Sequence, residues 1–119
     1  MNSNKELNYQ INLTYLETTF GDNKLIINKV LNSFMNNTPQ LLEDLSLKAV
    51  NSNWQDVQMI AHKMKSSFNT LGATSIGNML AEIERGANVG EFQSILDMVN
   101  QVKELSKQVF KEVQLELNK

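Results

Sequence analysis

The sequence predicts an all-α fold, an up-down-up-down antiparallel four-helix bundle with a short extra N-terminal helix. The chain has one proline and five glycines among 119 residues, so few positions interrupt a helix. Four long stretches place apolar residues at steps of three and four, the spacing of one face of an amphipathic helix. Short links between these stretches favour antiparallel neighbours. No stretch alternates apolar and polar residues as a half-buried β-strand does.

The length indicates one domain, large enough to bury a hydrophobic core without disulfides. Hydrophobic residues make up 41% of the chain and charged residues 20%, an ordinary balance for a globular protein. Residues 1–11 are rich in Asn, Ser and Gln, and we predict a loose N-terminal arm there. Residues 12–119 are assigned to a single helical bundle domain.

The first predicted helix covers residues 12–20 and ends at Gly21. Its apolar side is formed by Leu13, Leu16 and Phe20. Asp22 is then expected to cap the next helix, because its carboxylate can accept hydrogen bonds from the free amides of a first helical turn.

The second predicted helix begins near Asn23. Its apolar face starts with Ile27, Val30, Leu31 and Phe34. We expect a kink or a short break at residues 36–39, where Thr38 would cap a continuation whose first turn holds Pro39. The continuation carries the apolar residues Leu41, Leu42, Leu45 and Ala49. Residues 51–53 are expected to form a turn.

The third predicted helix has the strongest apolar periodicity in the chain. Asn53 is expected to cap it, and Asp56 in its first turn favours the helix dipole. Its buried stripe is predicted to consist of Trp54, Val57, Ala61, Met64, Phe68 and Leu71. Gly72 is expected to end it in the left-handed conformation of a C′ residue.

Two further helices complete the bundle. Thr74 or Ser75 is expected to cap the fourth, and Gly86 and Gly90 bracket the link that follows. The inward residues of the fourth helix are predicted to be Ile76, Met79, Leu80, Ile83 and Ala87. The fifth helix is predicted to start near Glu91 and to run almost to residue 119. Its inward residues are predicted to be Phe92, Ile95, Val99, Val102, Val109 and Val113, with Leu96 and Leu105 beside them.

Composition and charge exclude several classes of function. The net charge is −2 without a long run of either sign, so the basic footprint of a nucleic-acid-binding protein is missing. The chain has no cysteine, which rules out a thiolate metal site and a cysteine nucleophile. Residues 1–9 lack the apolar stretch of a signal peptide, and no window is apolar enough to span a bilayer. We therefore expect a cytoplasmic monomer that binds neither nucleic acid nor membrane.

His62 is the only histidine and lies within the third predicted helix. With about 100° of rotation per residue, it falls roughly 130° from the centre of the buried stripe. His62 therefore faces solvent, and the sequence alone leaves two readings open, an ordinary surface histidine and a functional one.

The neighbours of His62 on its helix face favour the functional reading. Four residues share that face: Gln55, Met59, Ser66 and Asn69. A flexible exposed methionine beside a histidine and small polar residues is typical of a docking face for a protein partner, although it is also compatible with an ordinary surface. Lys65 lies within side-chain reach of His62 and could neutralise phosphate oxygens there, or it could be a solvated lysine. Ser66 is small and leaves the imidazole uncrowded.

The run Ala-His-Lys-Met-Lys-Ser at residues 61–66, followed by Leu-Gly-Ala at 71–73, resembles the signature of histidine phosphotransfer (HPt) domains. The family pattern is Ala-His-x-Leu-Lys-Gly with a Gly-Ala a few residues later. The similarity extends over roughly residues 13–110 and is also carried by residues 20–22, 34–45, 53–54 and 80–84. Met64 replaces the usual Leu and Ser66 replaces the usual Gly, and the second change adds bulk where receiver domains approach.

The resemblance implies a phosphorelay intermediate of two-component signal transduction. His62 would accept a phosphoryl group on Nε2 from a receiver-domain aspartate and pass it to another, with Lys65 assisting and Ser66 at the receiver contact. A neutral imidazole is nucleophilic near neutral pH, and phosphoryl transfer needs positioning and charge neutralisation more than acid–base groups. The implied partners are response-regulator receiver domains, including that of a hybrid histidine kinase. Their magnesium ion would serve the reaction, and the chain would need no cofactor of its own.

Three further expectations limit or compete with this hypothesis. The chain lacks a Gly-rich phosphate-binding loop, so we expect a phosphotransfer protein without kinase or ATP-binding activity. A non-phosphorylated HPt-like interaction module is the alternative function. A metal- or haem-binding bundle would need several inward Glu and His residues, whereas His62 faces outward and Glu82 and Glu84 are expected on the helix surface.

Overall fold

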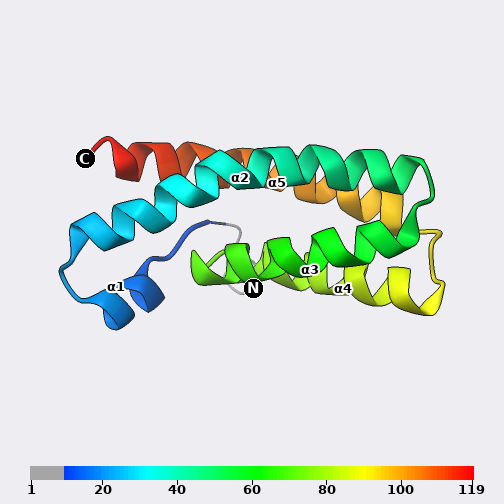
Figure 1. Cartoon of the computed structure of the whole chain (residues 1–119), viewed down its shortest axis with the longest axis horizontal. Helices are drawn as coiled ribbons and strands as arrows, with labels where there is room; N and C mark the ends of the chain where they lie inside the picture. Colours follow the sequence, from blue (N-terminus) through cyan, green and yellow to red (C-terminus); the bar gives the residue numbers. More distant parts are fainter. Residues whose placement is uncertain (1–9) are drawn as a thin grey trace, which may run out of the picture.

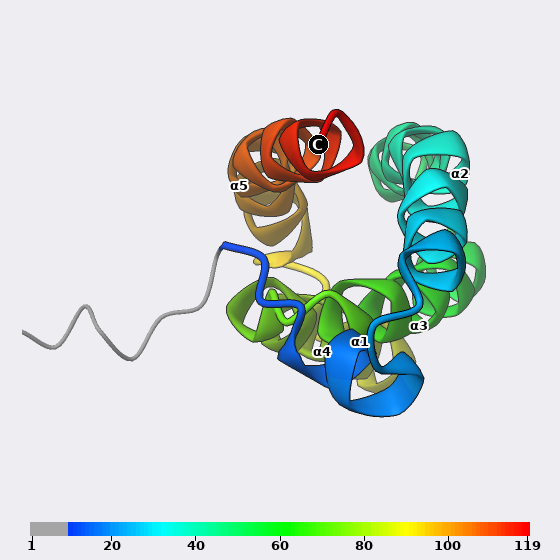
Figure 2. The ribbon, with the colours of Figure 1, turned by 90° about the vertical axis from the view of Figure 1, so that its left-hand side faces the viewer.

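The computed structural model describes residues 10–119 and confirms the all-α prediction. The described part contains five helices and no strand. The helices are α1 (Thr14–Phe20), α2 (Lys24–Val50), α3 (Trp54–Thr70), α4 (Thr74–Val89) and α5 (Ile95–Leu117). Figure 1 shows α2 and α5 along one side of the bundle and α3 and α4 along the other. Each of these four helices packs against the next, and α5 closes the ring against α2 (Figure 2). The result is the predicted antiparallel four-helix bundle with a short extra helix.

The core lies between the four long helices and contains most of the residues that the apolar periodicity predicted, whereas Phe92 and Leu96 of the predicted fifth helix are exposed. The fully buried side chains of α3 are Val57, Ala61, Met64 and Phe68, while Trp54 at its start is half-buried. The other helices contribute Leu31, Leu45, Ile76, Leu80, Ile83, Ile95, Val99, Val102, Val109 and Val113. Phe34 meets Phe68 edge-on, with ring centroids 5.2 Å apart, which joins α2 to α3 in the core. The side of α3 that faces away from the core is exposed to solvent and carries His62.

The predicted break in the second helix is wrong, because α2 continues through Pro39 without interruption. Thr38 therefore caps nothing and lies buried on the inner face. Proline inside a helix costs about 3 kcal/mol, and here it removes the hydrogen bond to the carbonyl of Met35. Burial of Phe34, Leu42 and Leu45 on the same face offsets this cost, since each large apolar side chain contributes about 1.5–3 kcal/mol. Figure 1 shows that the axis of α2 bends along its length, as the predicted kink implies.

Two predicted capping residues are replaced by their neighbours. The first turn of α2 is capped by Asn23 and not by Asp22, because the Asn23 side chain accepts a hydrogen bond from the Ile26 amide at 3.2 Å. Helix α4 begins at Thr74, so its N-cap position falls on Ala73 instead of on Thr74 or Ser75.

The starts of the other three helices agree with the prediction only in part. Helix α1 starts at Thr14 and not at residue 12. Asn53 occupies the N-cap position of α3, but its side chain makes no capping hydrogen bond. Helix α5 starts at Ile95 and not near Glu91. Phe92 lies in the link before α5, where its ring stacks flat on Trp54 with centroids 4.4 Å apart. This aromatic contact holds the link in a non-helical path.

The end of α3 follows the prediction for Gly72. The amide of Gly72 donates to the Asn69 carbonyl and the amide of Ala73 to the Phe68 carbonyl, each at 3.0 Å, with Gly72 at a φ of 80°. This pair of hydrogen bonds is a Schellman motif. A side chain at position 72 would also collide with Asn12, whose amide donates to the Leu71 carbonyl at 2.7 Å. The segment before α1 is thereby attached to the end of α3.

Residues 1–9 of the predicted N-terminal arm lie outside the residues that the structure describes. At residue 11 the chain already contacts the bundle, because the Ile11 amide donates to Glu112 Oε1 of α5 at 2.9 Å and its side chain packs against the core. No helix among residues 10–119 is both long enough and apolar enough to cross a membrane.

Candidate functional site

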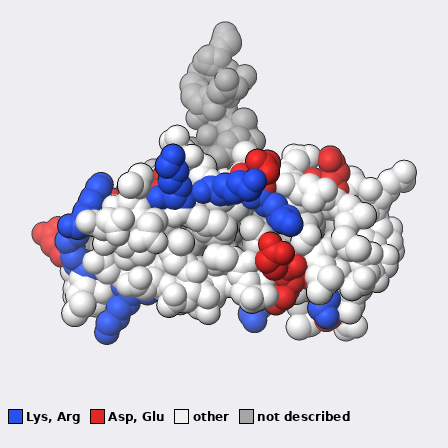
Figure 3. Space-filling model, turned by 90° about the horizontal axis from the view of Figure 1, so that it is seen from above, with Lys and Arg blue, Asp and Glu red and all other residues white. Residues whose placement is uncertain are grey.

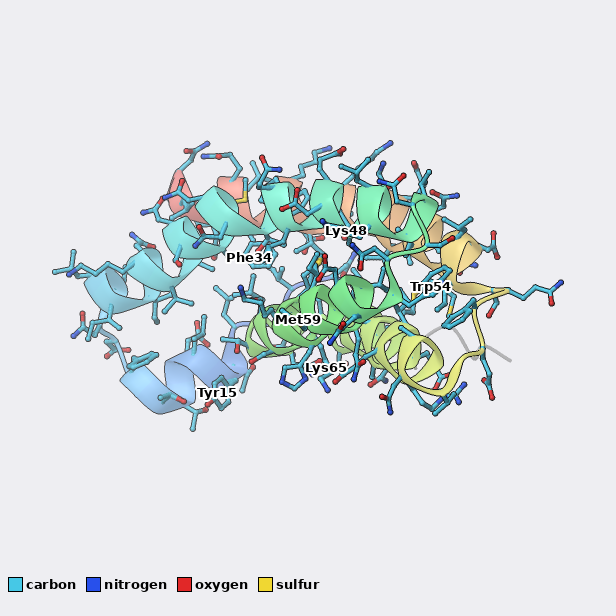
Figure 4. All side chains as sticks on the ribbon, turned by 45° about the vertical axis from the view of Figure 1, so that its right-hand side comes forward. Tyr15, Phe34, Lys48, Trp54, Met59 and Lys65 are labelled. Atoms are coloured by element: carbon cyan, nitrogen blue, oxygen red, sulfur yellow. The ribbon has the colours of Figure 1, made fainter. Side chains whose placement is uncertain are left out.

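His62 lies on the outer side of α3, as the helical wheel predicted. Its side chain is 65% exposed. Ala61 and Met64 on the inner side are fully buried and hold this part of the helix against the core. Figure 4 marks Met59 and Lys65 on the same helix and Tyr15 on α1. The histidine is therefore a solvent-facing group on a well-anchored helix.

Glu84 of α4 joins His62 to Lys65 through a single carboxylate. Its Oε2 lies 2.9 Å from His62 Nδ1, and its Oε1 accepts a hydrogen bond from Lys65 Nζ at 2.9 Å. The Glu84 side chain is 23% exposed. Glu84 was expected on the helix surface, and it lies there only in part, because the close packing of α4 on α3 brings its carboxylate against the two α3 side chains. Glu82, by contrast, is exposed as predicted.

The position of Glu84 at the edge of the buried face was visible in the sequence. It follows buried Leu80 by four residues and buried Gly77 by seven, which places all three on adjacent rows of α4. A Cβ at position 77 would overlap the side-chain amide of Asn69 on α3. The glycine thus lets the two helices approach closely, and this approach brings Glu84 within hydrogen-bond distance of His62.

The electrostatics of Glu84 determine which nitrogen of His62 is open. Partial burial by itself would raise the pKa of Glu84, but the hydrogen bonds and charges of Lys65 and His62 outweigh it and lower the pKa below its ordinary value. Glu84 is therefore ionised near neutral pH and can only accept a hydrogen bond. A neutral His62 ring then carries its proton on Nδ1, facing Glu84, and its lone pair on Nε2. Nε2 has no hydrogen-bond partner among the described residues.

Lys65 lies next to His62, and its ammonium group is bound to Glu84. Its side chain is 30% exposed and forms an ion pair with Glu84. The sequence interpretation placed its charge near an imidazole-bound phosphate. In the structure, Lys65 is bound to Glu84, the same carboxylate that contacts His62.

An open hollow of about 420 Å³ lies beside His62. It is lined by Tyr15, His62, Lys65, Ser66, Asn69 and Thr70. Four residues of the predicted site thus meet in one place, whereas Gln55 and Met59 are exposed on the same helix face nearer its N-terminal end. Tyr15 was not predicted, because only the attachment of the segment before α1 to the end of α3 brings it there. Ser66 and Thr70 also border a second hollow between α2 and α3, whose floor includes Phe34.

Two further surface features bear on the rival functions. Among residues 10–119, no group of three or more His, Asp or Glu side chains lies close enough together to hold a metal ion. Figure 3 shows both basic and acidic side chains on the face over α2 and α5, with broad uncharged areas around them. That face lacks the single-sign patch expected of a nucleic-acid-binding surface.

Comparison with known families matches the chain to one of them. A family model described as Hpt domain matches residues 29–111, which include α3, α4 and the His62 site. No curated protein and no solved structure matches the chain significantly. The match spans most of the chain, and the helical bundle with an outward histidine agrees with it. The chain therefore belongs to the Hpt domain family, whose members transfer phosphoryl groups through a histidine in phosphorelay signalling and interact with receiver domains.

Proposed function

We propose that the chain is a phosphorelay intermediate in which His62 accepts a phosphoryl group from one receiver-domain aspartate and passes it to another. The observation that carries this proposal is the orientation of the His62 ring. Its Nδ1 is bound to Glu84, and its Nε2 has no partner among the described residues. The ring is held in place, yet its nucleophilic nitrogen is open to a reacting phosphorus atom.

The chemistry needs little from this chain beyond position and charge. Phosphoryl transfer requires the attacking and leaving atoms in line and the charge on the phosphoryl oxygens neutralised. Anchored helix α3 supplies the position of His62. Lys65 supplies a positive charge that its flexible stem can move between Glu84 and the phosphoryl oxygens. We expect the receiver domain to bring the reacting aspartate and its magnesium ion.

A receiver domain would cover the hollow beside His62. Ser66 and Asn69 line that hollow, and exposed Gln55 and Met59 continue the same face along α3. Met59 is 59% exposed and offers an adaptable apolar contact. We propose these four residues as the partner-binding surface. We expect the chain to act as a cytoplasmic monomer on receiver domains, including that of a hybrid histidine kinase.

Transfer of label from phosphorylated receivers tests the proposal. Candidate receiver domains are phosphorylated with ³²P and mixed with the wild-type chain or with His62→Gln. Label that appears on the wild type and is absent from the variant supports the relay. If no receiver from the same organism labels the wild type, the relay proposal fails. Receiver binding without any transfer would favour the alternative, a non-phosphorylated interaction module.

A further inference from the structure

Three hydroxyl groups lie along the second half of α3, and one of them differs from the other two. Ser67 Oγ donates to the Lys63 carbonyl at 3.5 Å, and Thr70 Oγ1 donates to the Ser66 carbonyl at 2.9 Å. Such a bond to the carbonyl four residues earlier is common for Ser and Thr within a helix. The Ser66 hydroxyl makes no hydrogen bond to any described residue. It is therefore available to a group that is not part of this fold.

The free hydroxyl of Ser66 lies beside His62. Ser66 follows His62 by four residues, so the two side chains are neighbours one helical turn apart. Side chains on a helix lean toward its N-terminus, which inclines Ser66 toward His62. Both residues line the same open hollow. A group bound to the ring in that hollow thus lies next to the Ser66 hydroxyl.

On the surface of α3, Ser66 and Lys65 lie to either side of His62. Lys65 Nζ is bound to Glu84 of α4, whereas Ser66 also borders the hollow between α2 and α3. Glu84 contacts the ring at Nδ1, and the two ring nitrogens diverge, so Nε2 points away from α4. The open nitrogen therefore faces the side of the ring on which Ser66 lies.

We propose that the Ser66 hydroxyl donates a hydrogen bond to the phosphoryl group carried by His62 Nε2, and thereby stabilises the phosphorylated form of the chain. The inference rests on the proposed function of His62. Glycine, the usual residue of the family pattern at this position, offers no such donor, so the hydroxyl is a feature of this sequence. Ser66 then does more than leave room for a receiver domain, because it contacts the transferred group itself.

Ser66 takes part in no covalent step of the transfer. The Nε2 lone pair forms a bond to phosphorus as the bond from phosphorus to the receiver aspartate oxygen breaks, and that electron pair leaves with the aspartate carboxylate. The phosphoryl oxygens remain negatively charged, and a hydrogen bond to a charged acceptor is stronger than one between neutral groups. The hydroxyl keeps its own proton throughout and acts only as a donor.

The distribution of label at equilibrium with a receiver separates this role from docking. That distribution depends on the stability of the two phosphorylated proteins and not on the contacts in the transient complex between them. Wild type and Ser66→Ala are each incubated with the same ³²P-labelled receiver until the distribution is constant. In Ser66→Ala the ratio of phosphohistidine to phosphoaspartate should fall about fivefold, because one charge-assisted hydrogen bond is lost. An unchanged ratio would overturn the proposal.

A second measurement needs no receiver. Purified chain is labelled with excess phosphoramidate, the reagent is removed, and ³¹P NMR follows the decay of the signal from the single histidine. The half-life should be about fivefold shorter in Ser66→Ala, because the hydrogen bond holds the phosphoryl group on the ring and is lost as phosphorus moves away. Ser67→Ala is the matched control and should decay like the wild type, since the Ser67 hydroxyl is bound to the Lys63 carbonyl.

The outcomes distinguish the role of Ser66 from the relay function. Equal half-lives for wild type and Ser66→Ala contradict the role of Ser66, and the relay function stands if a receiver still labels His62. If phosphoramidate labels His62 and no receiver does, the relay function fails while the decay comparison still decides the role of Ser66. An equally short half-life in Ser67→Ala would assign the effect to the helix and overturn the proposal.

Discussion

Two clusters of charged side chains on α4 are built from adjacent residues and differ in their effect. In one, Glu84 lies between two α3 side chains, His62 and Lys65, and is largely covered. In the other, Arg85 lies between Glu82 and Glu91 and is 49% exposed. The first joins two helices around His62, the proposed phosphoryl acceptor. The second joins α4 to the link that follows it and faces water.

The difference between the clusters follows from burial and from the groups they hold. The Arg85 guanidinium donates hydrogen bonds to Glu82 and Glu91, and these bonds together with the two negative charges raise the pKa of Arg85. The same guanidinium lowers the pKa of Glu82. An exposed pair of this kind contributes little stability, because water and salt screen it. The Glu84 cluster has similar bonds but orients the ring of His62, the proposed phosphoryl acceptor. Similar ion pairs on one helix can thus serve surface stability or chemistry, according to what they contact.

The largest expected effect on phosphoryl transfer comes from blocking receiver access to the hollow beside His62, compared with a similar change near the Arg85 cluster. Ser66→Phe places a bulky side chain at an exposed position that lines the hollow beside His62. Displacing a partner by even about 1 Å can cost about a hundredfold in rate, so transfer from a receiver should fall by that order. Asn88→Phe is the matched control near the Arg85 cluster and should transfer normally. Chemical labelling by phosphoramidate should be unchanged in both, and a Ser66→Phe variant with full transfer would contradict the proposed docking surface.

The second largest expected effect on the transfer rate comes from removing Lys65, compared with removing Arg85. Lys65→Ala should slow transfer from a receiver about tenfold, because one charge-assisted contact to the phosphoryl oxygens is lost. Arg85→Ala removes a cation of the other cluster and should leave the transfer rate unchanged. Label-transfer rates are measured together with circular dichroism. A loss of helical signal in Lys65→Ala would mean that Lys65 supports the fold instead of the reaction.

Acid unfolding compares the two carboxylates. The pKa values of Glu84 and Glu82 are both lowered from the ordinary value of 4.5. Each therefore stabilises the fold above that pH, and the contribution is lost as the pH falls through the lower folded-state pKa. Glu84→Gln should flatten the decline in unfolding free energy below pH 4.5 more than Glu82→Gln does, since its carboxylate is largely covered and spans two helices. Urea unfolding at a series of acid pH values gives the comparison, and an equal flattening in both variants would argue against it.

The smallest expected effect is the change in stability caused by removing Arg85 from the exposed cluster. Arg85→Ala should leave the unfolding free energy almost unchanged, because its partners are also exposed. Urea unfolding at neutral pH measures this directly. A clear loss of stability in this variant would show that the Arg85 cluster anchors the link before α5.

The features that the sequence determined by itself are those set by local periodicity and local turns. The steps of three and four identified the buried stripe of α3 and hence the outward direction of His62 and Met59, because a helix wheel depends only on positions within one helix. Gly72 was identified as the end of α3 for a similar reason, since a left-handed residue after a helix favours glycine. Ser66 and Asn69 followed from the same wheel.

The remaining features depended on contacts between distant parts of the chain. Glu84 is separated from His62 by 22 residues, and only the close packing of α4 on α3 joins them. Tyr15 reaches the hollow because the segment before α1 is attached to the end of α3 by the hydrogen bond from the Asn12 amide to the Leu71 carbonyl. The continuity of α2 through Pro39 also depends on tertiary packing. Burial of the inner face of α2 outweighs the local cost of proline within the helix. The sequence by itself thus determined that His62 faces solvent. The tertiary structure decided which ring nitrogen is open, because the partner that orients a side chain can lie anywhere in the chain.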